Sequence, residues 1–123
     1  MTDENKQWHT VCSVDEVDGT GAYGFKIIAG KYPLFGFVVQ KEGEIYGYTN
    51  VCPHAGRPLD WAPNAFLTKN KDHIMCSAHG AMFEMENGLC VAGPCLGKSL
   101  KPWHIEVRDN TVFAEIPPEP LVR

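Results

Sequence analysis

NVCPHAGRPLDW, the stretch from Asn50 to Trp61, places a cysteine and a histidine two positions apart with a proline between them. A second stretch, IMCSAHGAMF from Ile74 to Phe83, carries a cysteine and a histidine three positions apart. A glycine follows each pair closely, as expected where the backbone must pass near a bulky group. The residues concerned are Cys52 with His54, and Cys76 with His79. Two such pairs in one short chain predict a shared metal-containing site that is built by two loops.

Length and composition indicate one small globular domain. The chain has 123 residues, of which 44% are hydrophobic and 21% are charged. Eleven basic residues against fifteen acidic ones give a net charge of −4. This balance argues against a nucleic-acid-binding protein, since affinity for phosphate comes from clustered lysine and arginine. The sequence has no run of about 18 apolar residues, so no membrane span is expected.

The N-terminal sequence MTDENKQWHT is polar and lacks the basic start and the apolar stretch of an export signal. We therefore expect a cytoplasmic protein, and we expect a monomer or a weak oligomer. In a reducing cytosol the five cysteines point to metal or redox chemistry more than to a disulfide framework.

Short β-rich runs recur along the chain, and each ends at Gly, Pro, Asn or Asp, which predicts antiparallel strands in a sandwich or barrel. The expected strands are Trp8–Val14, Phe25–Ala29, Phe35–Gln40, Ile45–Thr49, His73–Cys76, Met82–Met85, Leu89–Val91, Trp103–Val107 and Val112–Ile116. KEGE (Lys41–Glu44) and RDNT (Arg108–Thr111) are predicted hairpin turns, because Gly and Asn accept positive φ at low cost. A short helix is expected only within Trp61–Asn70, and the proline-rich end IPPEPLVR is expected to form an extended tail.

GTGAYG, from Gly19 to Gly24, matches the glycine pattern of dinucleotide-binding proteins, G-x-G-x-x-G. That pattern binds a pyrophosphate only where a helix follows it. Here FKIIAGKYP follows, a β-rich run that stops at Pro33. We interpret the glycines as a loop between strands.

Two kinds of metal group suit two cysteines and two histidines. Tetrahedral zinc accepts this donor set, but its usual spacing pairs Cys with Cys and His with His. A di-iron cluster with both thiolates on one iron and both imidazoles on the other takes one donor of each kind from each loop. The mixed pairs in this chain favour the di-iron arrangement.

CPHAGRPL (52–59) and CSAHGAMF (76–83) resemble the two cluster-binding loops of the Rieske [2Fe–2S] family, and GLCVAGPC (88–95) resembles the family's third loop. The resemblance implies an all-β Rieske-like fold of three stacked antiparallel sheets with a small cluster-binding subdomain. It implies that Cys52 and Cys76 hold one iron and that His54 and His79 hold the other, with one cluster per chain. It also implies a single domain over residues 1–117, with cluster-binding loops at about 50–97, followed by a C-terminal tail over 118–123.

The chain lacks side chains that characterise the respiratory Rieske proteins. Those proteins have a disulfide between the two loops, whereas the matching positions here are Arg57 and Ala78. They also donate hydrogen bonds to the cluster from a Ser and a Tyr, where this chain has Ala81 and Phe83. Because a hydrogen bond to sulfur favours the reduced state, these differences predict a potential at the low end of the Rieske range of roughly −150 to +300 mV.

The low-potential pattern resembles the small Rieske ferredoxins, which implies an electron-transfer protein that turns over no substrate alone. The implied partners are a reductase and an oxygenase. Two alternatives are the small subunit of a multi-component reductase, similar to the nitrite reductase small chain, and a zinc-stapled binding module. An oxygenase catalytic chain needs a further domain with a mononuclear iron site, for which 123 residues leave no room.

A docking face for redox partners is expected around the cluster. Its apolar centre is predicted to comprise Pro58, Leu59, Trp61, Pro94 and Leu96, with Arg57 and Lys98 as steering charges. The alternative for Leu59 and Trp61 is that they pack beneath the loop.

The remaining cysteines and histidines are expected to lie outside the metal site. Cys90 and Cys95 are expected as thiols in a reducing cytosol, with a disulfide between them as the alternative. Cys12 is expected to be a small core residue. His9, His73 and His104 are expected to be ordinary surface side chains.

Overall fold

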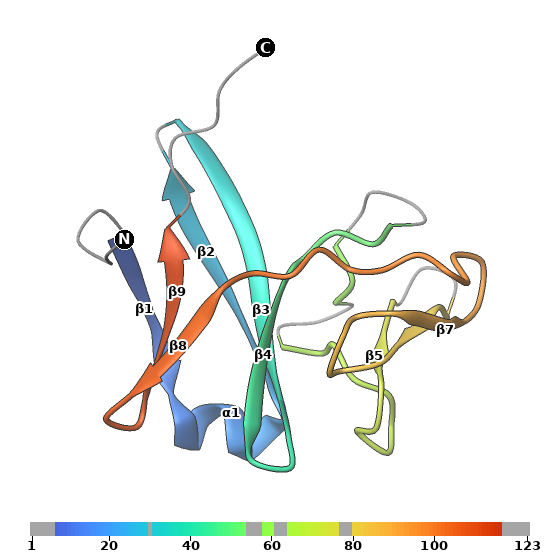
Figure 1. Cartoon of the computed structure of the whole chain (residues 1–123), viewed down its shortest axis with the longest axis horizontal. Coiled ribbons are helices and arrows are strands. Elements are labelled where there is room, and N and C mark those ends of the chain that lie inside the picture. Colours follow the sequence, from blue (N-terminus) through green and yellow to red (C-terminus); the bar gives the residue numbers. More distant parts are fainter. Residues whose placement is uncertain (1–6, 30, 54–57, 61–63, 77–79, 117–123) are drawn as a thin grey trace.

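The computed structural model describes residues 7–29, 31–53, 58–60, 64–76 and 80–116. Within these residues the chain forms nine strands and one helix (Figure 1). The strands are β1 (Gln7–Ser13), β2 (Ala22–Ala29), β3 (Tyr32–Lys41), β4 (Glu44–Thr49), β5 (Ile74–Met75), β6 (Met82–Phe83), β7 (Cys90–Ala92), β8 (Ile105–Arg108) and β9 (Thr111–Ile116), and the helix is α1 (Val14–Thr20).

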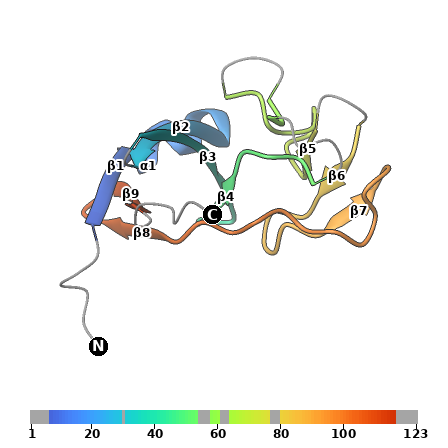
Figure 2. The same ribbon diagram turned by 90° about the horizontal axis from the view of Figure 1, so that it is seen from above.

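The strands form three small antiparallel sheets, in the orders β1-β9-β8, β2-β3-β4 and β5-β6-β7. In Figure 1 the first two sheets lie together and the third projects to one side, and Figure 2 shows the same separation from above. We call the first two sheets with α1 the large lobe, and residues 50–100, which contain the third sheet, the small lobe. The expected all-β fold of three antiparallel sheets is confirmed.

Both predicted hairpin turns of the large lobe are confirmed. The turns Lys41–Glu44 and Arg108–Thr111 each pair their outer residues across the ladder. Their central residues have positive φ, namely Glu42 (53°), Gly43 (85°), Asp109 (51°) and Asn110 (62°). Two consecutive residues of this kind match the right-handed twist of the flanking strands.

Helix α1, which follows β1 directly, is absent from the elements expected from the sequence. Ser13 caps it: the Ser13 Oγ accepts a hydrogen bond from the Glu16 amide at 3.1 Å, and the Glu16 Oε1 accepts one from the Ser13 amide at 2.9 Å. This capping box satisfies two amide donors at the helix start, and Gly21 ends the helix with a φ of 87°. Seven residues are too few for a hydrophobic period to be visible. No helix in the described part of the chain is long and apolar enough to cross a bilayer.

Two predictions about local structure are wrong. Gly19–Gly24 is not a loop between strands, because Gly19 lies in α1 and Gly24 lies in β2. Among the described residues 64–70 there is no helix, since Leu67 forms an isolated β-bridge with Ile74. The small-lobe strands β5 and β6 have only two residues each and are shorter than expected. The predicted tail and residues 61–63 lie outside the described residues.

Strand β3 separates two hydrophobic cores, because successive side chains of a strand point to opposite faces. Phe37 and Val39 belong to the core shared with the small lobe, whereas Val38 belongs to the core of the large lobe. Phe37 stacks on Phe66 of the small lobe, with ring centroids 4.3 Å apart and planes inclined by 10°. The small lobe is therefore packed on the β2-β3-β4 sheet through a continuous apolar interior.

Cys12 belongs to the core of the large lobe, as expected. Its buried neighbours in that core are Val17, Val38 and Val112. Burial, with a smaller contribution from the charge of Glu16, raises the pKa of the Cys12 thiol to about 12. This cysteine is therefore an inert packing residue at neutral pH.

The chain enters and leaves the small lobe at one place. The Thr49 amide donates to the Lys101 carbonyl at 2.9 Å, and the Trp103 amide donates to the Gly47 carbonyl at 2.9 Å. In Figure 1 the green segment leaving β4 and the orange segment leading to β8 run beside each other at this point. The small lobe is thus an excursion between β4 and β8 whose two ends are hydrogen-bonded together.

Two side-chain contacts join the large lobe to the β6–β7 connection. The buried hydroxyl of Tyr48 donates to the Met85 carbonyl at 2.6 Å, and the Lys41 Nζ lies 2.6 Å from the Glu86 Oε2. Burial, followed by the charges of Tyr46 and Glu86, raises the pKa of Tyr48 to about 12. The phenol therefore keeps its proton and remains a donor across the neutral range.

Candidate metal centre

The two loop cysteines predicted as metal ligands are brought into one core. Cys52 lies three residues after the end of β4, and Cys76 directly follows β5. Their side chains are 0% and 1% exposed, and both belong to the core shared by the two lobes. The predicted partners His54 and His79, together with Arg57, Trp61 and Ala78, lie outside the described residues.

Asn50 closes the first loop at its base. Its backbone amide donates to the Phe35 carbonyl at 2.9 Å, which fixes it to β3. Its side-chain Oδ1 accepts from the Leu59 amide at 2.7 Å, and its Nδ2 donates to the Asp60 Oδ1 at 3.0 Å. With 8% of its surface exposed, Asn50 is a buried polar residue that spans the loop containing Cys52.

We expect Asn50→Ala to destabilise the protein by about 1–3 kcal/mol, because it leaves the buried Leu59 amide without an acceptor. Chemical denaturation with a two-state fit measures this change. Asn87→Ala is a matched control, since Asn87 also accepts from a backbone amide (Leu89, 2.8 Å) and donates to a carboxylate (Glu84, 3.0 Å), but it is exposed. If both variants lose the same free energy of unfolding, the burial of Asn50 adds nothing to the cost of removing its side chain.

The second loop begins at Cys76 and is closed by the backbone of that residue. The Cys76 amide donates to the Ala81 carbonyl at 2.8 Å, and the Gly80 amide donates to the Cys76 carbonyl at 3.0 Å. Gly80 has a φ of 72°, a conformation that side-chain-bearing residues rarely adopt. Cys76 is therefore fixed at the narrow base of its loop.

The third loop, which follows β7, packs directly on the second. Gly93 has a φ of 98°, and a Cβ placed on it would lie 2.7 Å from the Ala81 Cα. Only a glycine permits this approach of two backbones. The contact brings Cys90 and Cys95 of the third loop next to the second loop, and both side chains are buried.

Cys90 and Cys95 bring two more thiols to the site. The Cys95 thiol donates to the Cys90 sulfur at 3.1 Å, and the Cys90 thiol is 3.2 Å from the Ala92 carbonyl. Burial raises the pKa of Cys95 to about 12, with smaller contributions from the hydrogen bond to Cys90 and from the charges of Cys90, Cys52 and Cys76. Cys90, Cys52 and Cys76 therefore lie close enough to Cys95 to affect its pKa. In this structure Cys90 and Cys95 are thiols that share a hydrogen bond rather than a disulfide.

Within the described residues there is no group of three or more His, Cys, Asp or Glu side chains placed to hold one metal ion. Cys52 and Cys76 supply two soft thiolate donors from separate loops. The two predicted histidine ligands belong to the same two loops in the sequence.

The predicted docking face is partly wrong. Leu59 is 0% exposed, so it packs beneath the first loop and contributes nothing to the surface. Pro58, Pro94 and Lys98 are exposed, and Leu96 is 66% exposed. Among the described residues, Leu96 of the third loop is the most exposed large hydrophobic side chain.

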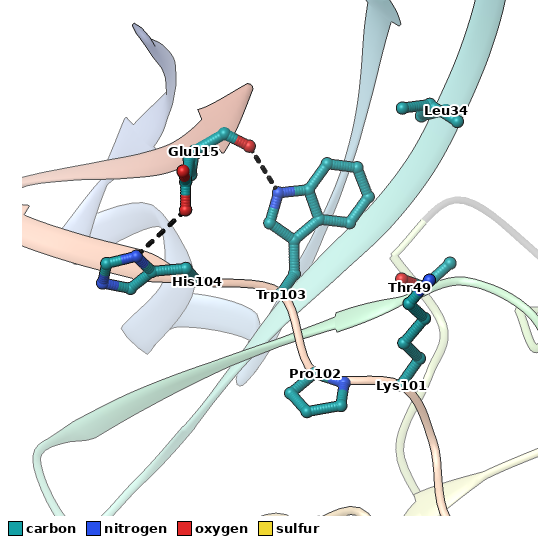
Figure 3. Close-up of a pocket in the computed structure, with 7 residues that line it drawn as sticks. All are labelled: Leu34, Thr49, Lys101, Pro102, Trp103, His104 and Glu115. Carbon is teal, nitrogen blue, oxygen red and sulfur yellow. Dashed lines mark hydrogen bonds and ion pairs between the residues drawn. The ribbon is translucent and has the colours of Figure 1, made fainter. Parts of the chain in front are cut away.

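A pocket in the large lobe lies apart from the small-lobe strands that carry the thiols (Figure 3). Its volume is about 320 Å³, and it is lined by Leu34, Thr49, Lys101, Pro102, Trp103, His104 and Glu115. The Trp103 indole donates to the Glu115 carbonyl at 2.7 Å, and the His104 Nδ1 lies 3.1 Å from the Glu115 carboxylate. The polar groups of Trp103 and His104 in this pocket are therefore already paired with Glu115. The exposed side chain of His104 agrees with the prediction of an ordinary surface histidine.

Asn50 is the site residue that the sequence interpretation missed. An Asn at the end of a β-rich run, two residues before a loop cysteine, is a signal for a side chain that can hydrogen-bond backbone across a loop. The proximity of Cys95 to Cys52 and Cys76 agrees with the resemblance of residues 88–95 to the third loop of the family, and the packing of Gly93 against Ala81 is its structural cause.

Comparison with known proteins agrees with the site. The Rieske [2Fe-2S] domain model matches residues 7–111, and no curated protein sequence matches the chain. The ferredoxin of carbazole 1,9a-dioxygenase from Nocardioides aromaticivorans IC177 is similar in structure, with a TM-score of 0.68 and 19% identity over 88% of this chain and 96% of that chain. The terminal oxygenase of carbazole 1,9a-dioxygenase from Novosphingobium sp. KA1 gives a TM-score of 0.64 and 21% identity over 88% of this chain.

A complex of a substituted oxygenase with the ferredoxin of carbazole 1,9a-dioxygenase gives a TM-score of 0.69 and 20% identity over 89% of this chain. The chain spans 28% of the length of the chain matched in that complex and 29% of the length of the terminal oxygenase. At these identities the structural likeness shows the fold. The family model matches most of the sequence, and the chain therefore belongs to the Rieske [2Fe–2S] domain family.

Proposed function

We propose that this protein is an electron carrier whose [2Fe–2S] cluster is bound by Cys52 and Cys76 on one iron and by His54 and His79 on the other. The observation that carries the proposal is the placement of Cys52 and Cys76. These two cysteines come from separate loops, are both buried, and lie in one core of a chain that matches the Rieske domain. Thiolates are the donors that iron–sulfur clusters require, so the described part of the donor set fits the group. One cluster per chain and one domain over residues 1–117 follow from the same assignment.

When bound, the cluster accepts and releases one electron. The chain's own residues keep the cysteine side of the site dry, since Cys52, Cys76, Ala81 and Phe83 are all at most 1% exposed. Asn50 and the backbone of Cys76 hold the bases of the two loops in fixed positions.

We infer that the electrons are delivered to an oxygenase and received from a reductase. The ferredoxin from Nocardioides aromaticivorans supports this role, because the present chain spans 96% of its length. The matched oxygenase chains are more than three times as long as the part that aligns with this chain. A catalytic oxygenase role for this chain therefore has less support. A carrier of this kind turns over no substrate alone.

Anaerobic purification followed by metal analysis and EPR tests the proposal. We expect two irons and two acid-labile sulfides per chain, a rhombic signal in the reduced state, and uptake of one electron per chain in coulometry. The reduced protein should then pass that electron to cytochrome c, used as a soluble acceptor. A colourless protein with bound zinc and no EPR signal would overturn both the cluster and the carrier role.

The reduction potential is expected to lie at the low end of the Rieske range, below about +150 mV. Ala81 and Phe83 are fully buried near the proposed cluster and have no hydroxyl to donate to its sulfurs. Combining Ala81→Ser with Phe83→Tyr should therefore raise the midpoint in a redox titration followed by visible absorbance. Phe113→Tyr in β9 of the large lobe is the control and should leave the midpoint unchanged. A double variant with the parent midpoint would exclude the hydroxyl explanation.

A further inference from the structure

Cys90 and Cys95 form a close pair of thiols within one loop. Their sulfurs are 3.1 Å apart and share a hydrogen bond, whereas a disulfide bond has a length of about 2.05 Å. Closing the bond therefore requires a movement of about 1 Å. Both side chains are already buried in the same core, so no rearrangement of the fold is needed.

The backbone around the pair is already closed into a compact loop. The Cys90 amide donates to the Lys98 carbonyl at 2.8 Å, and the Lys98 amide donates to the Cys95 carbonyl at 2.9 Å. The Gly97 amide makes a longer bond of 3.3 Å to the Cys90 carbonyl. These bonds close the backbone around the pair, and within that loop the two sulfurs face each other at 3.1 Å.

The two cysteines differ in how firmly they are held. Cys90 lies in β7 and pairs with Phe83 of β6, whereas Cys95 lies in the turn that follows β7. In Figure 1 this turn lies at the end of the small lobe away from the large lobe. Its neighbours Pro94, Leu96 and Lys98 are exposed. Opening the turn alone would expose Cys95 to a reagent in solution.

We propose that Cys90 and Cys95 are a redox-active dithiol that forms a reversible disulfide by exchange with small-molecule disulfides such as oxidised glutathione. The pair is distinct from the proposed ligands Cys52 and Cys76 and adds a two-electron thiol site to the one-electron cluster. The disulfide would tie the third loop to β7, and through Gly93 it would stiffen the packing of that loop on Ala81.

The exchange proceeds in two balanced steps. Once the turn has opened, Cys95 is in water and no longer in the apolar core that disfavours its thiolate. The Cys95 thiolate then attacks one sulfur of oxidised glutathione, which forms a mixed disulfide and releases one glutathione thiolate that takes up the proton Cys95 has lost. The Cys90 sulfur then attacks the Cys95 sulfur, which forms the intramolecular bond and releases the second glutathione. The dithiol loses two electrons and two protons, and both appear in the two glutathione thiols.

Thiol counting on the intact holoprotein tests the proposal. The protein is equilibrated without oxygen in buffers of reduced or oxidised glutathione, quenched with acid, unfolded and labelled with a maleimide. We expect five labels per chain from the reduced buffer, since the chain has five cysteines, and a loss of two labels in the oxidised buffer. Tandem mass spectrometry should place the missing labels on Cys90 and Cys95, and reduced glutathione should restore them.

Single substitutions provide the controls. In Cys90→Ser and in Cys95→Ser the intramolecular disulfide cannot form, so oxidised buffer should no longer remove two labels. Cys12→Ser, whose residue lies in the other core, should still lose two labels in that buffer. Visible absorbance of the cluster, recorded in parallel, reports separately on the proposed function. Five labels in every buffer would overturn the dithiol, and so would a disulfide that includes Cys52 or Cys76. Five labels in every buffer would leave the cluster assignment untouched, whereas a disulfide that includes Cys52 or Cys76 would also contradict their role as ligands.

Discussion

Cys52→Ala is expected to yield a protein without a [2Fe–2S] cluster, with loss of the visible absorption, of the bound iron and of the reduced-state EPR signal. The reason is that Cys52 provides one of only two thiolates in the proposed donor set, and an alanine methyl group cannot bind iron. Because Cys52 is fully buried, no water can take its place without rearrangement of the core. Iron analysis of the purified variant measures the effect directly.

Cys12→Ala is the matched control for this experiment. Cys12 is also a buried free cysteine, with 7% of its surface exposed, but it lies in the core of the large lobe. We expect this variant to keep its full iron content. Far-ultraviolet circular dichroism of both variants would show whether the β-structure is retained. Two irons per chain in Cys52→Ala would remove Cys52 from the ligand set.

Phe66→Ala is expected to cause the largest loss of stability, about 3–5 kcal/mol. Phe66 is 1% exposed, and its ring stacks on Phe37 across the contact between the lobes. A cavity at this position removes apolar burial from both lobes. For a domain with a total stability of about 5–15 kcal/mol, this is a large share. The free energy of unfolding in denaturant, measured on the protein as purified, gives the change.

Phe35→Ala is a suitable comparison, because Phe35 is also in β3 but is 49% exposed. Its loss should be well below that of Phe66→Ala, since truncation of a half-exposed ring leaves no closed cavity. If both variants unfold at the same denaturant concentration, the stacked pair is not a main source of the contact between the lobes.

Much of the large lobe could be predicted from local chemistry. Gly43 and Asn110 mark the two hairpin turns because both residue types accept positive φ. Helix α1 could not be found from periodicity, yet its start is visible in the sequence SVDE, where Ser13 and Glu16 form a capping box. The capping residues, rather than a repeat of hydrophobic residues, are therefore the signal in the sequence for helix α1.

The small lobe was harder to predict because its strands are defined by partners distant in the sequence. Leu67 pairs with Ile74 in a segment where a helix was expected, and Asn64 nearby has a φ of 63°. The pairs of Cys and His were recognisable from spacing alone, whereas the burial of Leu59 depends on the hydrogen bond from its amide to Asn50. Spacing predicts candidate donors, but packing decides which neighbouring side chains reach the surface.

The hydrogen-bonded junction of Thr49 with Lys101 has a consequence for protein engineering and for evolution. A segment whose two ends meet can be transplanted as a cassette, because the host needs to supply only a pair of adjacent strand ends. Residues 50–100 satisfy this condition, although their core also requires the apolar face of β3. A recipient scaffold would therefore have to offer both a two-stranded docking edge and an aromatic platform equivalent to Phe37.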